Sequence, residues 1–165
     1  MTTLPRRPLR TLTLAASAAA LAGLALAAPA SADEVVPAPL AEPGELHVLD
    51  RTNLARAAAG CAPLALDQAL VLAADRHTAD MAATGTMSHT GTDGSSPRTR
   101  LAAAGAFPRI AAENVAVGYD AAAVVDAWLA SPGHRANLLD CRLTTIGISE
   151  QHSARGSWWT QVLAG

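Results

Sequence analysis

The chain has 165 residues, twelve arginines, no lysine and a formal charge of −2 at pH 7. The lack of lysine excludes a P-loop nucleotide site, Schiff-base chemistry and a lysine general base. The arginines are scattered and do not form the clustered basic face of nucleic-acid-binding domains, so no nucleic-acid partner is expected.

The N-terminal segment, residues 1–32, has the pattern of a secretory signal peptide. Three arginines within the first ten residues precede an uncharged run rich in alanine and leucine, and Ala30-Ser31-Ala32 follows as a small-residue cleavage site. Cleavage there leaves nine arginines against all 14 acidic residues, a formal charge of −5. We therefore predict an extracellular, monomeric protein of one domain with no transmembrane segment in the mature chain. Export by the general secretory route is favoured, with the twin-arginine route as the alternative because of Arg6-Arg7.

The two cysteines, Cys61 and Cys141, both lie in the exported part. In an oxidising compartment an even pair predicts a disulfide before it predicts a nucleophile or a zinc ligand. The bridge closes a loop of about eighty residues, which the chain-entropy model values at roughly 4–5 kcal/mol.

Helical patterns alternate with Gly and Pro stops along the mature chain. Residues 33–43 carry three prolines and predict a linker, and the predicted domain covers residues 44–165. The first helix begins at Gly44 and stops at Gly60, and the second follows Asp67, a plausible N-cap, and stops at Gly85. A short helix is predicted from Pro97 to Ala104 and another from Ala121 to Ala130. The last ends at Ser131-Pro132-Gly133, a break that sets His134 at a fixed bend.

Three strands are predicted, over residues 113–117, 144–149 and 157–163. Trp158 and Trp159 are adjacent in the third strand, so their side chains point to opposite faces of the sheet. Because neither ring gains by staying in water, both faces should be covered by helices. The predicted fold is α+β, a three-layer α-β-α sandwich with a small, mainly antiparallel central sheet.

Several short motifs occur here in the order that one family shows. They are Asn53 with Arg56, Pro63-Leu64, Asp80-Met81, Ser88-His89, Glu113-Asn114-Val115, Trp128 followed by Ser131-Pro132-Gly133-His134-Arg135-Ala136-Asn137, Ile146-Gly147 and Trp159-Thr160-Gln161. On these motifs the chain resembles a bacterial member of the CAP superfamily of cysteine-rich secretory, antigen 5 and pathogenesis-related 1 proteins. The resemblance spans about residues 44–163 and implies an α-β-α sandwich with a central cleft.

The resemblance also implies a set of site residues. Eukaryotic members line the cleft with two His and two Glu that can hold a divalent cation, and His89 and Glu113 match the first His and the first Glu. Ser131 stands where the second Glu is usual, and Trp158 where the second His is usual. We expect His134 to fill the cleft instead.

The predicted site therefore consists of His89, Glu113 and His134. Two imidazoles and a carboxylate resemble the ligand set of catalytic zinc sites, but the set is small, so we expect weak zinc binding and no required cofactor. A buried carboxylate such as Glu113 needs charged or hydrogen-bonding partners. His77 lies on an apolar helical stripe, which is typical of a satisfied core histidine.

Three functions remain open from the sequence. The first is a non-catalytic binding module for an extracellular ligand, with a lipid or a cell-surface component as the partner class. The second is a metal-dependent hydrolase that uses His89, Glu113 and His134, and the third is a structural envelope protein with a vestigial cleft. An enzyme is not indicated, because the sequence has no H-E-x-x-H, no G-x-S-x-G and no second carboxylate in a special context.

Overall fold

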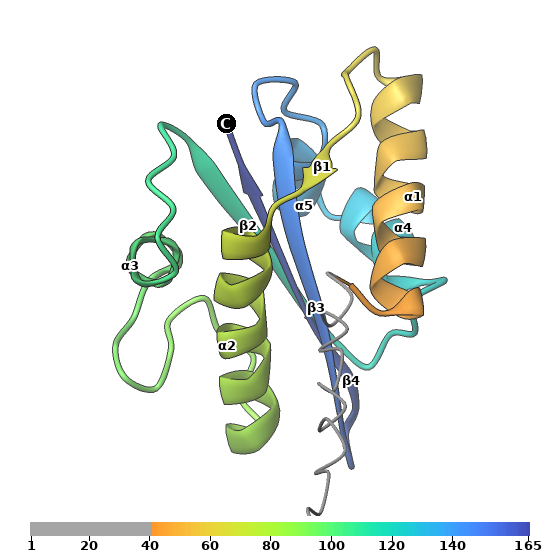
Figure 1. The fold of residues 1–165 in the computed structure, drawn as a ribbon. Coiled ribbons are helices and arrows are strands. Elements are labelled where there is room, and N and C mark those ends of the chain that lie inside the picture. The colour runs from red at the N-terminus through yellow and green to blue at the C-terminus, as the bar shows by residue number, and fades with distance from the viewer. Residues whose placement is uncertain (1–40) are drawn as a thin grey trace, which may run out of the picture. The chain divides into compact units, whose positions relative to one another are not determined.

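The computed structural model describes residues 41–165, so the predicted signal peptide and most of the predicted linker lie outside the described residues. This part of the chain contains five helices and four strands (Figure 1). The helices are α1 (Pro43–Ala58), α2 (Gln68–Thr84), α3 (Pro97–Ala103), α4 (Val124–Ala130) and α5 (Pro132–Leu138). The strands are β1 (Ala65–Leu66), β2 (Ala111–Val117), β3 (Thr145–Ser153) and β4 (Gly156–Ala164).

The four strands form one sheet in the order β1-β3-β4-β2. β3 and β4 pair antiparallel, β2 pairs antiparallel with β4, and the two-residue β1 pairs parallel with β3. Figure 1 shows α2 and α3 on one side of the sheet and α1, α4 and α5 on the other. The predicted three-layer sandwich is confirmed, and β2 is one of the two edge strands.

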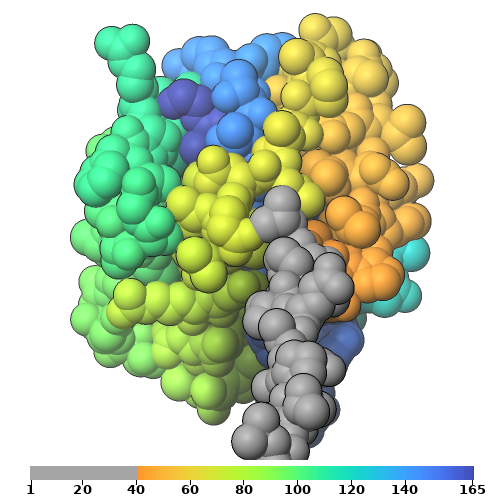
Figure 2. Space-filling view, in the orientation of Figure 1, coloured from red at the N-terminus to blue at the C-terminus, as the bar shows by residue number. Residues whose placement is uncertain are grey.

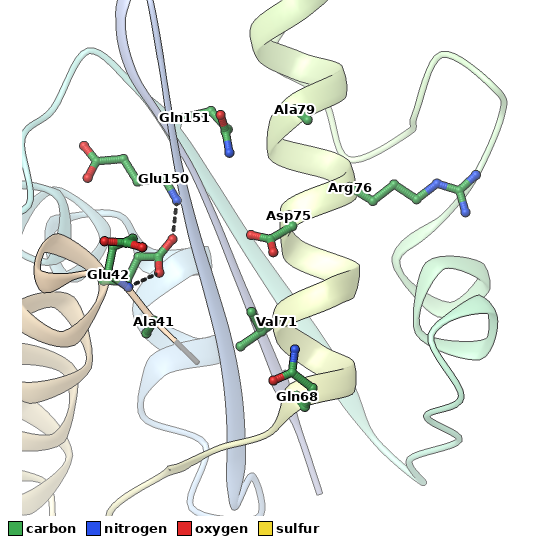
Figure 3. A pocket seen from close by; sticks show the side chains of 10 residues that line it. Ala41, Glu42, Gln68, Val71, Asp75, Arg76, Ala79, Glu150 and Gln151 are labelled. Carbon is green, nitrogen blue, oxygen red and sulfur yellow. Dashed lines mark hydrogen bonds between the residues drawn. The ribbon is translucent and has the colours of Figure 1, made fainter. Parts of the chain in front are cut away.

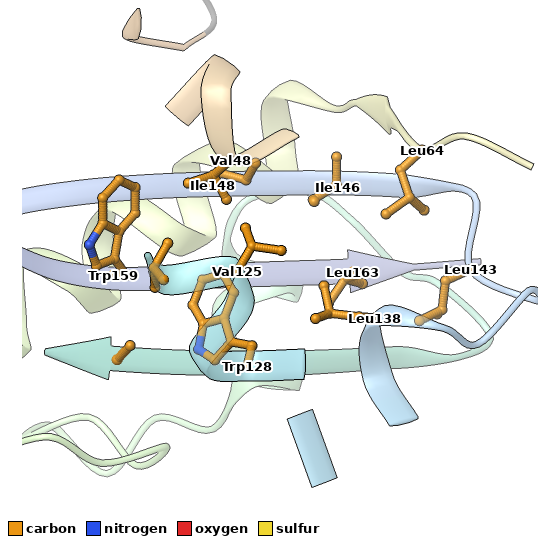
Figure 4. Close-up of a cluster of buried hydrophobic side chains, with 12 residues drawn as sticks. Val48, Leu64, Val125, Trp128, Leu138, Leu143, Ile146, Ile148, Trp159 and Leu163 are labelled. Atoms are coloured by element: carbon orange, nitrogen blue, oxygen red, sulfur yellow. The ribbon is translucent and has the colours of Figure 1, made fainter. Parts of the chain in front are cut away.

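The two adjacent tryptophans of β4 anchor the two halves of the core. Trp159 is fully buried in the cluster that also contains Val48 of α1 and Trp128 of α4 (Figure 4). Trp158, which is 1% exposed, packs on the opposite face with Met81 of α2. Because each ring is covered by a different helical layer, burial of both stabilises the whole sandwich. This confirms that the two rings are buried on opposite faces.

A disulfide and a buried arginine hold the end of α1 against the segment that follows α5. Cys61 and Cys141 are bonded, with their Cα atoms 4.9 Å apart, as predicted. Arg56, fully buried, donates hydrogen bonds to four backbone carbonyls at 2.8–3.0 Å, those of Ala62, Leu138, Asp140 and Leu143. A guanidinium has five N–H donors and can satisfy several buried carbonyls at once. Arg56 therefore supplies hydrogen bonds that these carbonyls do not receive from a helix or a strand.

The break after α4 differs from the prediction in its detail. Ser131 has an extended backbone and both ends α4 and precedes α5, whereas Gly133 lies inside α5 with ordinary helical geometry. Pro132 explains this, because it disfavours helix at the residue before it and suits the first position of a new helix. His134 therefore sits in the first turn of a short helix and not at a glycine bend.

Within residues 41–165, no helix combines the length and the hydropathy needed to cross a bilayer.

Candidate functional site

Glu113 is the centre of a buried charge cluster on the side of β2 that faces α2 and α3. Its side chain is only 2% exposed. Arg100 of α3 donates from Nη2 to one carboxylate oxygen at 2.6 Å, and His89 donates from Nδ1 to the other at 2.8 Å. The partners that a buried carboxylate requires are thus an arginine and a histidine.

Arg100 is the member of the cluster that the sequence did not reveal. Its side chain is 1% exposed, and besides Glu113 it contacts the carbonyls of Ser95 at 3.0 Å and His89 at 3.1 Å. In the sequence it is one of several scattered arginines. Residues 94–112 contain no aspartate or glutamate, so Arg100 has no carboxylate nearby in the sequence. This is the only sign in the sequence that its partner is distant in the chain.

His77 is buried beside the same cluster, as expected for a core histidine, but only one of its two ring nitrogens has a hydrogen-bond partner among the described residues. Its fully buried ring donates from Nε2 to the carbonyl of Ser88 at 2.7 Å, and the same nitrogen is 3.8 Å from Glu113. Burial lowers the pKa of His77, and the attraction of Glu113 only partly offsets this. His77 thus donates a hydrogen bond to the carbonyl of Ser88, and Arg100 donates one to the carbonyl of His89. Together these bonds fix the backbone that carries the His89 ring.

The His89 ring, by contrast, is 53% exposed and sits at the boundary between the cluster and solvent. Its hydrogen bond to Glu113 raises the pKa of His89, although partial burial opposes the shift. Burial lowers the pKa of His134, and the nearby His89 charge lowers it further. In the structure, His89 contacts Glu113. His134 lies near enough to His89 for the charge of His89 to affect its pKa. Within the described residues, no hydrogen bond joins the His134 ring to Glu113.

Side chains from α4 and α5 cover the free edge of β2. Trp128 donates from its indole nitrogen to the carbonyl of Val115 at 3.2 Å, and Asn137 donates to the carbonyl of Glu113 at 3.2 Å. Asn114, fully buried, donates to the carbonyl of His134 at 3.3 Å and to the side chain of Gln161 at 3.1 Å. The bonds from Trp128 and Asn137 satisfy carbonyls of the β2 edge that would otherwise be open to pairing with another strand, whereas the Asn114 bonds tie β2 to α5 and β4.

A cleft of about 320 Å³ lies beside this edge. Apolar atoms provide most of its wall, and Met87 and Tyr119, which are 53% and 44% exposed, stand among the lining residues. His134 is the titratable side chain of the cleft with a lowered pKa. The lining residues are Met87, Val115, Ala116, Val117, Tyr119, Ala127, Trp128, Ser131 and His134.

The site does not fit the two-His, two-Glu metal set that the resemblance implies. The described residues contain no group of three His, Cys, Asp or Glu side chains placed to hold a metal ion. Both oxygens of Glu113 are already engaged, and the Arg100 guanidinium 2.6 Å away would oppose a second cation. Weak zinc binding by His89, Glu113 and His134 stays a prediction.

A larger hollow of about 590 Å³ lies elsewhere, between the start of α1, α2 and β3 (Figure 3). Four acidic residues line it: Glu42, Glu45, Asp75 and Glu150. Glu45 is 6% exposed, and its oxygens accept the backbone N–H groups of Glu42 at 2.7 Å and Glu150 at 2.9 Å. Burial raises the pKa of Glu45. Glu45 therefore links α1 to β3, which is a structural role.

Comparison with known proteins places this geometry in a family. Residues 49–163 match the sequence model described as "CAP: Cysteine-rich secretory protein family". The chain is 34% identical over 122 residues to the uncharacterized protein YkwD of Bacillus subtilis (strain 168), and 36% identical over 105 residues to the uncharacterized membrane protein YlbC of the same strain. The matches cover 73% and 63% of this chain, but only 47% and 30% of those relatives.

Solved structures show the same fold. An extracellular protein from Bacillus anthracis str. Ames that contains an SCP domain superposes with a TM-score of 0.67 at 29% identity, covering 73% of this chain and 40% of that one. An outer surface protein of Borrelia burgdorferi gives a TM-score of 0.69 at 20% identity, covering 73% of this chain and 91% of that one. The second likeness concerns the fold alone. The family match begins within α1 and extends into β4, so it includes most of the fold and the whole Glu113 cluster. This chain therefore belongs to the cysteine-rich secretory protein (CAP) family.

Proposed function

We propose that this chain is an extracellular, non-catalytic binding module whose ligand site is the cleft beside β2. The observation that carries the proposal is the cleft itself, with its apolar wall, its exposed Met87 and Tyr119 and its single imidazole. Small-molecule sites in proteins have volumes of roughly 300–1,000 Å³, mostly apolar walls and a few polar groups that fix orientation. The ligand class that fits is a small apolar or amphiphilic molecule.

Catalysis is less well supported by the same residues. A hydrolase needs a carboxylate or imidazole that is free to accept a proton from water or substrate. Glu113 is instead held by Arg100 and His89, and it does not line the cleft. His134 is close to the ligand volume, but no acidic side chain contacts its ring within the described residues. The lowered pKa of His134 makes it an uncharged hydrogen-bonding group at neutral pH.

An extracellular location rests on three observations. The N-terminal 32 residues have the pattern of a signal peptide. The Cys61–Cys141 disulfide is typical of oxidising compartments. The Bacillus anthracis protein with the similar fold is described as extracellular.

Binding is tested in two stages. Protein purified from culture medium is extracted with organic solvent, and mass spectrometry of the extract identifies co-purifying molecules. The extracted protein is then titrated with a dansylated fatty acid. Ala127→Phe should fill the cleft and weaken binding about tenfold or more, which corresponds to 1.4 kcal/mol.

The matched control is Ala57→Phe, on the exposed side of α1 and outside the cleft. It adds the same side chain and should leave the affinity unchanged. Equal affinities for Ala127→Phe and wild type would show that the probe binds elsewhere. Absence of any bound or exchangeable ligand would favour a structural envelope protein with a vestigial cleft.

A further inference from the structure

Phe107 is the only phenylalanine of the chain, and it is 81% exposed. It lies in the segment between α3 and β2, which protrudes from the molecule in Figure 2. The backbone on both sides of the ring is anchored. Gly105, with φ +87°, follows the C-cap residue of α3, and the N–H of Ala106 donates to the carbonyl of Leu101 at 2.9 Å. Ile110 exchanges two backbone hydrogen bonds of 3.1 Å with Gly165. The Phe107 ring is therefore exposed to solvent, while the backbone on both sides of it is held by hydrogen bonds.

The charges around this ring are unusual for the chain. Six of the nine arginines in residues 41–165 donate side-chain hydrogen bonds to a carboxylate or a carbonyl. Among the described residues, Arg98, Arg109 and Arg135 have no such partner, and the first two flank Phe107. Residues 94–112 also contain no aspartate or glutamate, the longest such stretch after the predicted cleavage site. Neither an ion pair within the described residues nor an acidic side chain of this stretch neutralises the charges of Arg98 and Arg109.

We call Arg98, Phe107 and Arg109 the Phe107 tip. A hollow of only about 70 Å³ adjoins it, lined mainly by apolar residues. A hollow of this size does not hold a large side chain of a protein partner. A stable protein interface also buries about 800 Å² on each side, far more than one ring and two side chains offer. A fluid lipid surface, by contrast, deforms around a narrow tip and needs no matching shape.

We propose that the Phe107 tip docks this domain onto anionic lipid bilayers. The Phe107 ring enters the head-group region, and Arg98 and Arg109 pair with lipid phosphates, to which guanidinium groups bind in a bidentate manner. The negative charge of the mature chain opposes approach to the same surface. Binding is therefore weak, needs anionic lipid and falls with salt. The proposal is independent of any ligand in the cleft.

The test uses the exported protein and two kinds of sedimenting vesicle, one of pure phosphatidylcholine and one with equal phosphatidylglycerol. Wild type should co-sediment with the anionic vesicles at low salt and much less with the neutral ones. Arg98→Gln and Arg109→Gln should each weaken binding about fivefold. Phe107→Ser should weaken it by a similar or larger factor, because the buried apolar area is lost.

Two matched controls carry the same substitutions elsewhere. Leu54→Ser removes a hydrophobic side chain that is 67% exposed on α1, and Arg135→Gln removes the third arginine without a partner. Both should bind the vesicles like wild type. Equal binding of wild type to both vesicle types, or equal losses in the controls, would overturn the proposal. Concentration-dependent self-association that requires Phe107 and no lipid would overturn it as well, in favour of a protein contact.

Discussion

Arg100 and Glu113 form an ion pair at 2.6 Å in which both side chains are almost fully buried, at 1% and 2% exposure. The pair joins α3 to the edge strand β2 and supports the exposed His89 ring. Breaking such a pair leaves a buried charge without a partner, so it is the most sensitive point of the candidate site.

Arg100→Met should therefore destabilise the protein by about 3–5 kcal/mol. Urea unfolding measures this change. The double variant Arg100→Met with Glu113→Leu should recover much of the loss, because it removes both charges. A double variant that is less stable than Arg100→Met alone would contradict the explanation by an unpaired charge.

The two histidines that face Glu113 should affect stability in opposite pH ranges. The pKa of His89 is raised in the fold, so its contribution is fully present below its ordinary value of 6.5 and is lost as pH rises through the raised pKa. The pKa of His77 is lowered, so its contribution is present above 6.5 and is lost as pH falls through the lowered pKa. NMR titration of the two rings checks both directions.

His89→Gln isolates the first effect. It should cost less than about 1 kcal/mol, because the ring is half exposed, and the cost should be larger at pH 5.5 than at pH 8. The free energy of unfolding is compared at both pH values. An equal cost at both would show that charge on His89 does not contribute.

Zinc titration tests the metal prediction directly. Zinc should bind only weakly at pH 7.5, because Arg100 already neutralises Glu113, and this binding should fade at pH 5.5 as imidazoles protonate. Calorimetry of wild type and His89→Ala at both pH values measures this. Equal binding by the two proteins would exclude His89 as a ligand, and tight binding by wild type would contradict the inhibitory role of Arg100.

At Gly147, β3 packs directly against the backbone of α2. A Cβ added there would lie 2.1 Å from the backbone carbon of Leu70, so Gly147→Ala should cost about 3 kcal/mol or more. Gly133→Ala is the control, since its Cβ meets nothing within 4 Å and alanine favours the helix. Thermal unfolding compares the two. Similar melting temperatures would mean that α2 can move away from β3.

The disulfide should contribute substantially to stability. Replacing Cys61 and Cys141 by serine should lower the free energy of unfolding by roughly 4–5 kcal/mol in the chain-entropy model. Wild type under reducing conditions should behave in the same way, as urea unfolding can show. Intact mass after alkylation without reduction provides the check on pairing, and two free thiols in exported protein would refute it.

The sequence predicted those features that depend on local pattern. Asp67 accepts hydrogen bonds from the first turn of α2, Gly85 ends that helix in the left-handed conformation, and Trp158 and Trp159 are buried on opposite faces. These follow from capping chemistry and from the two-residue period of a strand. The cysteine pair was predictable because the chain offers no other pairing.

The features that it could not predict depend on contacts between distant segments. Arg100 pairs with Glu113 only because α3 folds back over β2, and no local spacing records that approach. β1 has two residues and is a strand only through its pairing with β3, and the predicted 144–149 strand continues to Ser153 only because β4 lies beside it.

The central position of β4 also determines when the protein can fold. β4 is the last strand in the sequence, yet it lies between β3 and β2 and is the only partner of β2 among the described strands. No sheet can therefore assemble around β2 until the ribosome has added the residues up to Ala164. The β3–β4 hairpin is local in sequence, but the pairing of β2 with β4 joins segments that are far apart in the chain, and such pairing forms slowly. The sheet therefore stays incomplete until the end of the domain has been synthesised.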